Sequence, residues 1–374
     1  MGQIADGSIA TPMARKFTGL AYGAAQGLRV AWYYGQKLAA ARAQSARPPV
    51  TNPAPQPDRP ARRKGGGQRL PDRTRILGDL ARLLARDWRN IAAGLYRMPD
   101  DLVPEPRAEW RRSRRFFADL AAVDERRRAN DHSEVTRQVP PGRYPRYYLQ
   151  NFHFQTDGYL SRHSAELYDH QVEVLFGGGA AAMRRQALVP LREAVARGGV
   201  RSARLLDLGC GTGRFLREVK SNYPSLAVTA LDLSPFYLEE ARRLLAPWSR
   251  SEFIAAAAED VPRPDGSFDI VTAIYLFHEL PPGRRRAVAG EIARLLKPGG
   301  TFILLDSLQR GDTPAYDGLL DRFPHGFHEP YYASYVSSDL AALFGTAGLV
   351  ADSAEPVYFS KLAVFRKPGR PDAG

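Results

Sequence analysis

The chain has 374 residues, of which 44% are hydrophobic and 25% are charged, proportions that are ordinary for a soluble globular protein. Its single cysteine, Cys210, excludes a disulfide framework and a cysteine-based zinc site. The formal net charge is +13, and residues 1–69 hold eleven lysines and arginines against two aspartates. This local surplus favours an anionic partner, either a membrane surface or a nucleic acid, over the alternative of a solvated basic tail.

Residues 1–45 are predicted to contain a basic amphipathic helix, over 12–44. Its apolar residues recur at intervals that approximate one helical face: Phe17, Ala21, Ala24, Leu28, Trp32 and Leu38. Charged residues interrupt the apolar run, so it is too short to span a membrane and does not resemble a secretory signal. We expect this helix to lie on a membrane surface, with packing on this protein or on a partner as the alternative. The expected location is cytoplasmic, or peripheral to the inner membrane.

Residues 46–71 are rich in proline, arginine and glycine and are predicted to form a disordered linker. The next region, 72–198, is predicted to be a helical and aromatic-rich lid. Within it, apolar residues at helical spacing predict an amphipathic helix that ends at Pro99. A second helix is expected over 106–128.

The region 199–368 alternates short apolar runs with helical patterns, which predicts an α/β domain with a parallel sheet wrapped by helices. Its predicted strands are 203–208, 227–232, 252–256, 268–274 and 300–306, and helices are expected at 213–221, 235–247 and 283–296. A last helix at 337–347 precedes two further strands, 355–360 and 361–366. Because almost no loop joins these two strands, they must be antiparallel.

A glycine-rich turn with the spacing G-x-G-x-G follows the first predicted strand, at Gly209, Gly211 and Gly213. Such a turn lets backbone N–H groups approach a ligand closely. Asp207 lies on the strand just before it, where a carboxylate would repel a pyrophosphate but suit the cationic methionine end of S-adenosylmethionine (SAM). Asp232 ends the next strand and can accept hydrogen bonds from ribose hydroxyls.

The segment 205–213 resembles motif I of the class I SAM-dependent methyltransferases, in particular the type 11 branch that contains the ubiquinone and menaquinone C-methyltransferases. The segments 258–262, 268–280 and 295–300 resemble later motifs of this family, in the same order. The resemblance implies a Rossmann-like seven-stranded sheet with six parallel strands and one antiparallel strand, here with an α-helical N-terminal extension. It also implies SAM as the cofactor, with a nicotinamide-binding domain as the alternative. The residues expected to bind SAM are Asp207, Gly209, Gly211, Gly213, Asp232, Leu233, Ala258, Glu259, Tyr275 and Tyr168.

Two aromatic segments flank the motifs and are candidates for the acceptor side of the site. In the first, 144–169, the pair Tyr168 and Asp169 resembles the helix entry that closes over SAM in the quinone-modifying enzymes. The alternative is that these aromatic residues pack the N-terminal helices against the sheet. In the second, 323–332, aromatic rings could stack on a flat acceptor or face the sulfonium through cation–π attraction, and a packed aromatic loop is the alternative.

His278 is the first candidate for a catalytic general base, because imidazole titrates near neutral pH, and Glu329 is the second. A non-catalytic His278 is the alternative, since transfer to an already activated nucleophile needs only positioning. His325 and His328 are poorly spaced for a metal ion and no third ligand is in view, so no metal site is predicted.

Together these features predict in-line transfer of a methyl group from SAM to a small or lipophilic acceptor, quinone-like or otherwise associated with lipid. RNA or protein methylation is the alternative that the basic N-terminal arm supports, and nucleic acid is not the favoured partner. A SAM-binding regulator without turnover is the third hypothesis. The sequence leaves open the acceptor, the methylated atom and the oligomeric state.

Overall fold

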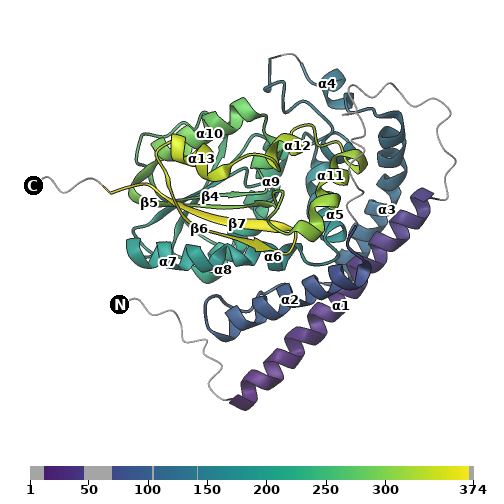
Figure 1. Ribbon diagram of the computed structural model, residues 1–374, viewed down its shortest axis with the longest axis horizontal. Helices are drawn as coiled ribbons and strands as arrows, with labels where there is room; N and C mark the ends of the chain where they lie inside the picture. The colour runs from purple at the N-terminus through teal and green to yellow at the C-terminus, as the bar shows by residue number, and fades with distance from the viewer. Residues whose placement is uncertain (1–11, 46–69, 103–104, 141, 370–374) are drawn as a thin grey trace, which may run out of the picture.

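The computed structural model describes residues 12–45, 70–102, 105–140 and 142–369 (Figure 1). Seven strands form one sheet in the order β3-β2-β1-β4-β5-β7-β6. β1 to β5 run parallel, and β7 runs antiparallel to both β5 and β6, so six strands share one direction. This confirms the predicted α/β class and the seven-stranded sheet. The strands are β1 (Arg204–Leu208), β2 (Ala227–Asp232), β3 (Ser251–Ala255), β4 (Phe268–Ile274), β5 (Leu296–Ser307), β6 (Val350–Val357) and β7 (Ser360–Arg366).

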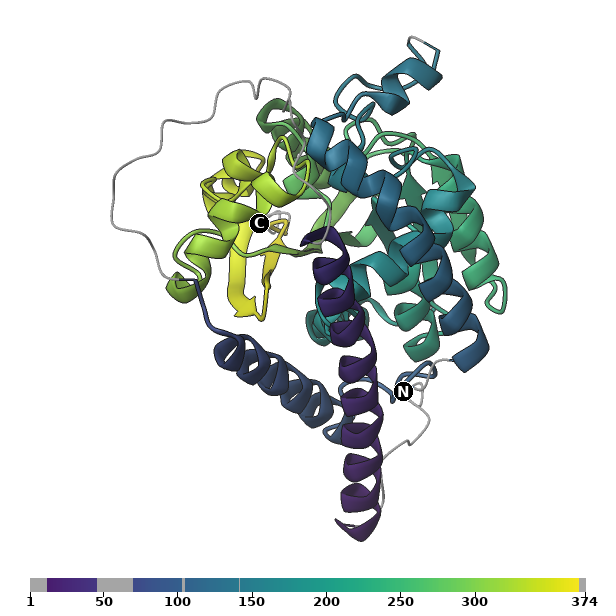
Figure 2. The ribbon, with the colours of Figure 1, turned by 90° about the vertical axis from the view of Figure 1, so that its right-hand side faces the viewer.

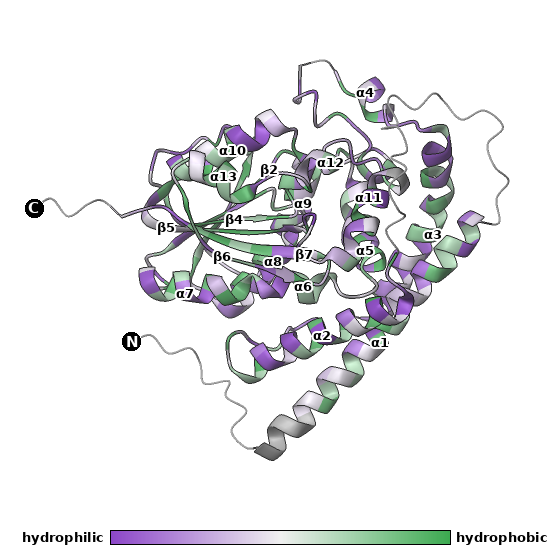
Figure 3. Cartoon of the chain, viewed as in Figure 1, coloured by the Kyte–Doolittle hydropathy of each residue, from purple (hydrophilic) through white to green (hydrophobic). Residues whose placement is uncertain are grey.

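Helices cover both faces of the sheet (Figure 1). One face carries α7 (Leu188–Gly198), α8 (Arg214–Asn222) and α9 (Pro235–Leu245), and the other carries α10 (Pro282–Leu295) and α13 (Leu340–Thr346). Successive strand side chains point to opposite faces, so Leu205 belongs to the first core and its neighbour Leu206 to the second. Figure 3 shows hydrophobic residues concentrated on the central strands. Since β1, β2 and β4 are parallel, their carboxyl ends meet at one edge, where ligands bind in folds of this kind.

The closing strand pair starts earlier than the sequence predicts. β6 begins at Val350 rather than at residue 355, and it is joined to β7 by Tyr358 and Phe359 alone. All residues of β6 before Val357 are exposed, because this strand lies at the edge of the sheet. No apolar run therefore marks its first half. The predicted antiparallel pairing of these two strands is confirmed.

Three long helices precede the sheet, α1 (Pro12–Ser45), α2 (Arg73–Ala92) and α3 (Pro106–Ala129), and Figures 1 and 2 show them along one side of it. α2 ends at Ala92 and not at Pro99, because Gly94 adopts a left-handed conformation with φ of 68°. Shorter elements complete the chain: α4 (Glu134–Gln138), η1 (Phe152–Phe154), α5 (Arg162–Leu175), α6 (Ala180–Gln186), η2 (Phe277–Glu279), η3 (Pro314–Tyr316), α11 (Asp317–Gly326) and α12 (Tyr332–Tyr335).

The buried face of α1 is not the apolar face that the sequence predicts. Tyr33 is buried and donates a hydrogen bond to Glu109, and Arg29 forms an ion pair of 2.8 Å with Glu173. Leu20 and Leu28, by contrast, are each 72% exposed. Polar side chains that find partners on α3 and α5 are buried here as readily as apolar ones. The helix therefore packs on this protein by its polar face and presents its apolar face to solvent.

None of the helices in the described ranges is long and apolar enough to cross a membrane. The predicted linker over 46–71 falls outside the described residues except for its last two positions, and so do the first eleven residues of the predicted N-terminal helical region.

Candidate cofactor and acceptor site

The glycine-rich turn joins β1 to α8 at the carboxyl edge of the sheet. Gly209, Gly211 and Gly213 all have positive φ, of 64°, 55° and 80°. A Cβ atom at Gly213 would lie 3.1 Å from the Cβ of Ala241 on α9, closer than ordinary packing. Only glycine therefore combines the left-handed backbone with this close approach of α8 to α9. The turn leaves the first N–H groups of α8 facing the edge of the sheet.

Two carboxylates flank this turn. Asp207, on β1, is 1% exposed and accepts a hydrogen bond of 2.6 Å from the hydroxyl of Thr272 on β4. Asp232, at the end of β2, accepts hydrogen bonds of 2.8 Å from the backbone N–H groups of Gly211 and Ser234, one on each oxygen. The second lone pair of each oxygen stays available to a ligand. Asp232 thus fixes the glycine turn while facing the same space as Asp207.

A cleft of about 1070 Å³ lies over this turn. Eight of the ten residues predicted to bind the cofactor line it: Asp207, Gly209, Gly211, Asp232, Leu233, Ala258, Tyr275 and Tyr168. Gly213 does not line the cleft, because it packs against α9. Glu259 does not line it either, because its carboxylate accepts a hydrogen bond of 2.8 Å from the hydroxyl of Tyr147. In the structure, Glu259 therefore binds Tyr147 and does not face the cleft.

An apolar cavity of about 1210 Å³ adjoins the cleft. The two share Tyr168, Val172, Tyr275 and Glu279 in their walls. Most of the remaining wall is apolar, with side chains from α5, α11 and the turn before β7: Leu175, Leu319, Leu320, Phe323, Phe327 and Phe359. A second apolar cavity continues from it between α1, α3 and α5 and shares Lys37 and Leu175 with it. Part of the predicted aromatic segment 323–332 thus faces this space.

Comparison with known proteins decides what the cleft is. Residues 205–300 match the family described as "Methyltransferase domain", and this range contains the glycine turn and both flanking aspartates. The ubiquinone/menaquinone biosynthesis C-methyltransferase of Methylobacterium nodulans is 32% identical over 165 residues. The demethylmenaquinone methyltransferase of Thermotoga maritima is 29% identical over 219 residues, which cover 54% of this chain and 90% of the relative.

Residues 205–300 therefore form a methyltransferase domain of the class I SAM-dependent kind. The cofactor of this family is SAM, as the resemblance of the motifs implied. The match to the Methylobacterium enzyme covers 43% of this chain and 63% of that enzyme. A third relative, the 2-methyl-6-phytyl-1,4-hydroquinone methyltransferase of Synechocystis, is 32% identical over 35% of this chain and 42% of its own length. The chain therefore spans less than two thirds of the length of these two relatives.

The two aspartates of the methyltransferase cleft predict a pH-dependent affinity for SAM. Burial raises the pKa of Asp207 to about 7 and the pKa of Asp232 to about 6. Only the ionised carboxylates attract the cationic cofactor, so binding should tighten as the pH rises through these values. Between about pH 5 and about pH 8 we expect a gain of about 100-fold from Asp207 alone. Calorimetric titration of SAM across this range measures the gain.

The control for this experiment is Asp207→Asn, which removes the titrating group with the higher pKa. This variant should bind SAM more weakly above pH 7 and should lose most of the change between pH 6 and 8. A wild-type affinity that stays constant from about pH 5 to about pH 8 would contradict the prediction.

The helix α5 closes one side of the methyltransferase cleft. The ring of Tyr168 packs edge-on against Tyr237, with centroids 5.4 Å apart. The neighbouring Asp169 accepts a hydrogen bond of 2.9 Å from the hydroxyl of Thr212 in the glycine turn and lies 3.2 Å from Arg214. These contacts fasten α5 to the turn. They place Tyr168 in the wall of the methyltransferase cleft, the position implied by the resemblance to the quinone-modifying enzymes.

His278 lies at the boundary of the apolar cavity and is paired with an aspartate that the sequence reasoning missed. Its Nδ1 is 2.6 Å from Oδ1 of Asp306 at the end of β5. Burial lowers the pKa of His278, but Asp306 outweighs burial and raises it to about 9. The imidazole is therefore largely protonated at neutral pH. A proton held on the imidazole disfavours the general-base role that the sequence analysis names, and that role stays a prediction.

Glu329, the second candidate base, follows α11 and is fully buried. Its Oε1 lies 3.0 Å from Nε2 of His153, and burial raises the pKa of its carboxyl group. It lines neither the methyltransferase cleft nor the two apolar cavities, so it does not face a bound acceptor there. No sequence motif pointed to His153, because this residue stands far from Glu329 along the chain.

Proposed function

We propose that this protein transfers a methyl group from SAM to a lipophilic small molecule. One observation carries the proposal: the cofactor cleft and the apolar cavity share Tyr168, Val172, Tyr275 and Glu279. A methyl group held in the cleft would then face an acceptor held in the cavity. The acceptor atom attacks the methyl carbon in line with the sulfur, and S-adenosylhomocysteine leaves. The protein contributes alignment and the exclusion of water.

The composition of the cavity supports a lipophilic acceptor over a nucleic acid or a protein. Leucine, phenylalanine, valine and tyrosine side chains form most of its wall. Of its two lysine and arginine residues, Lys37 donates its hydrogen bond inward, 2.7 Å to the carbonyl of Leu175, and only Arg322 is exposed. A polynucleotide would need exposed cations along its path. Relatives of this chain include enzymes named for quinones, for a phytyl hydroquinone and for fatty acids, which fits the same class of acceptor.

Methyl-labelled SAM tests this proposal. The purified protein is incubated with labelled SAM and with separate lipid, RNA and protein fractions of a cell extract, and we expect label in the lipid fraction. Leu319→Trp, which fills the apolar cavity, should reduce the label by about 10-fold or more while the affinity for SAM stays unchanged. Val350→Trp, on the exposed edge strand, is the matched control and should have no effect.

Label in the RNA or protein fraction would reject the lipophilic acceptor. Retained SAM binding with no label in any fraction would favour a SAM-binding regulator over an enzyme.

We further propose that the outer face of α1 contacts a membrane surface. Leu20, Leu28 and Trp32 follow one another at intervals of eight and four residues on this face and are 72%, 72% and 41% exposed. An apolar stripe on a surface helix is typical of an interfacial contact. In flotation with anionic lipid vesicles, we expect the wild-type protein to rise with the vesicles. The Leu20→Ser, Leu28→Ser, Trp32→Ser triple variant should stay in solution, and equal flotation of both proteins would reject the contact.

A further inference from the structure

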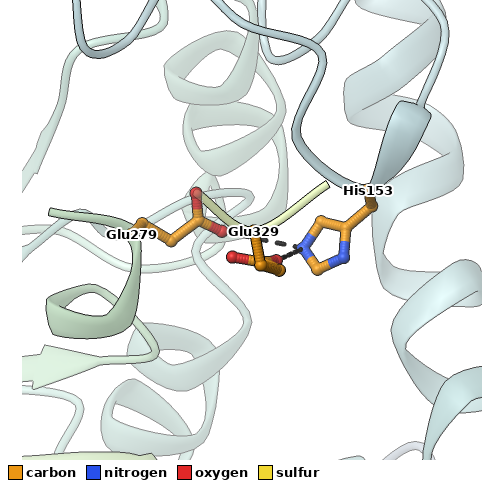
Figure 4. A group of neighbouring side chains, drawn as sticks. All are labelled: His153, Glu279 and Glu329. Atoms are coloured by element: carbon orange, nitrogen blue, oxygen red, sulfur yellow. Dashed lines mark ion pairs between the residues drawn. The ribbon is translucent and has the colours of Figure 1, made fainter. Parts of the chain in front are cut away.

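Three side chains from distant segments converge where the cofactor cleft meets the apolar cavity. They are His153 in η1, Glu279 in η2 and Glu329 after α11 (Figure 4). Nε2 of His153 lies 3.0 Å from Oε1 of Glu329 and 3.7 Å from Oε1 of Glu279. One ligand atom from each residue lies within 4.8 Å of the other two. Figure 4 shows both carboxylates and the imidazole turned toward a common centre.

The carboxylates of this cluster lack the partners that buried carboxylates require. The side chain of Glu329 is 0% exposed, and neither of its oxygens has a hydrogen bond. Oε2 of Glu279 also has none, while its Oε1 accepts one of 2.6 Å from the hydroxyl of Tyr159. A buried charged group without hydrogen bonds is costly, so such orphaned oxygens point to a missing partner.

The charges around the cluster identify the kind of partner. Glu279 and Glu329 bring two negative charges, and His153 supplies at most one positive charge. His278, next to Glu279 in the chain, has its Nδ1 2.6 Å from Oδ1 of Asp306. Two carboxylates thus share one imidazole in a site where the side chains of His153, Glu279 and Glu329 are 22%, 12% and 0% exposed. A divalent cation would neutralise the two carboxylates and leave His153 as a neutral ligand.

We propose that His153, Glu279 and Glu329 bind a divalent metal ion. Metal–ligand bonds of about 2.1 Å place adjacent ligand atoms about 3 Å apart. Nε2 of His153 lies at this distance, 3.0 Å, from Oε1 of Glu329, and slightly farther, 3.7 Å, from Oε1 of Glu279. One imidazole and two carboxylates form a mixed nitrogen and oxygen set, which suits Mn²⁺, Fe²⁺ or Zn²⁺ better than a soft metal.

The surroundings of the cluster also fit a metal site. Nε2 of His278 lies 3.8 Å from Oε1 of Glu279, while the Nδ1 of His278 is held by Asp306. Tyr159 orients Glu279 through its hydroxyl. His153 itself has a left-handed backbone with φ of 56°, a strained conformation that the fold maintains at this position.

The position of the site gives the metal a role, which rests on the proposed methyltransferase function. Glu279 lines both the cofactor cleft and the apolar cavity, and His153 lines the cavity. A metal ion held by them would have open coordination positions toward the cavity. It would bind an oxygen substituent of the acceptor and hold that acceptor next to the methyl donor. The acceptor class is thereby narrowed to lipophilic molecules that carry a hydroxyl or carbonyl oxygen.

Metal titration of the full-length protein tests the site directly. After treatment with a chelator and removal of the chelator, the protein is titrated with Mn²⁺, Fe²⁺ (without oxygen) and Zn²⁺ by calorimetry, and bound Mn²⁺ is also counted by electron paramagnetic resonance. We expect one ion per chain for at least one of these metals. Glu329→Gln and His153→Ala should each weaken binding of that metal at least about 10-fold.

Glu239→Gln is the control, because this exposed glutamate pairs with Arg162 on the surface and should leave metal binding unchanged. SAM affinity is measured for every variant and reports whether the fold and the cofactor cleft are intact. SAM binding without uptake of any of the three metals would overturn the metal site alone, as would equal metal affinity in Glu329→Gln and the wild type. Absence of SAM binding in the wild type would overturn the proposed function, whatever the metal result.

Discussion

Replacing Asp232 with alanine is expected to weaken SAM binding about 100-fold or more. Charge-assisted hydrogen bonds to the ribose hydroxyls contribute roughly 1.5–3 kcal/mol each, and two of them account for such a factor. The substitution also removes the acceptor for the backbone N–H groups of Gly211 and Ser234, which loosens the glycine turn. Calorimetric titration with SAM and with S-adenosylhomocysteine measures both losses, because the two ligands share the ribose.

Asp352→Ala is the matched control, since Asp352 forms an exposed ion pair of 2.8 Å with Arg366 on the far strands of the sheet. It should bind SAM like the wild type. If Asp232→Ala also kept the wild-type affinity, the assignment of Asp232 to the ribose would be rejected, and with it the reading of this cleft as a cofactor site.

Replacing Asp87 with alanine should destabilise the protein by about 3–5 kcal/mol. Asp87 on α2 is completely buried and lies within 2.5 Å of Nη2 of Arg185 on α6. It also accepts hydrogen bonds from the hydroxyls of Tyr22 on α1 and Tyr96. Its loss would leave the guanidinium of Arg185 buried with only Glu218, at 3.4 Å, as a counter-charge. The large effect comes from this uncompensated charge.

The adjacent Arg86→Ala is the control for this experiment. Arg86 pairs with Glu355 at the surface, where an ion pair contributes about 1 kcal/mol or less. Chemical denaturation followed by circular dichroism compares the free energies of unfolding. If Asp87→Ala and Arg86→Ala lowered the free energy of unfolding by the same small amount, the contacts of Asp87 would not be what joins α2 to the sheet domain.

Features encoded by short segments could be predicted from the sequence. The glycine turn, Asp207 and Asp232 follow from one strand, one turn and the end of the next strand, and the structure gathers them at a single edge. The strands and helices of the sheet domain follow from local patterns in the same way. An error arose where local pattern and packing disagree: β6 begins before its predicted start, because its first half lies at an exposed edge of the sheet.

Features that depend on tertiary contacts could not be predicted. Asp306 is 28 residues from His278, and their pairing changes the charge of the imidazole. His153, Glu279 and Glu329 come from three separate segments, and no spacing rule connects them. The search for a metal site by sequence considered only the neighbouring His325 and His328, because ligands that fold together from afar leave no local signature.

The walls of the apolar space have a consequence for how this protein diverged from its relatives. Residues 205–300 carry the match to the methyltransferase family, yet the wall of the apolar cavity comes from both sides of that range: Lys37 and Leu175 lie upstream of it, and Leu319 and Phe323 lie downstream. The donor site and the choice of acceptor would thus be encoded largely in different segments of one polypeptide. Exchange of the cavity-wall segments between homologues should then redirect methylation to a new compound.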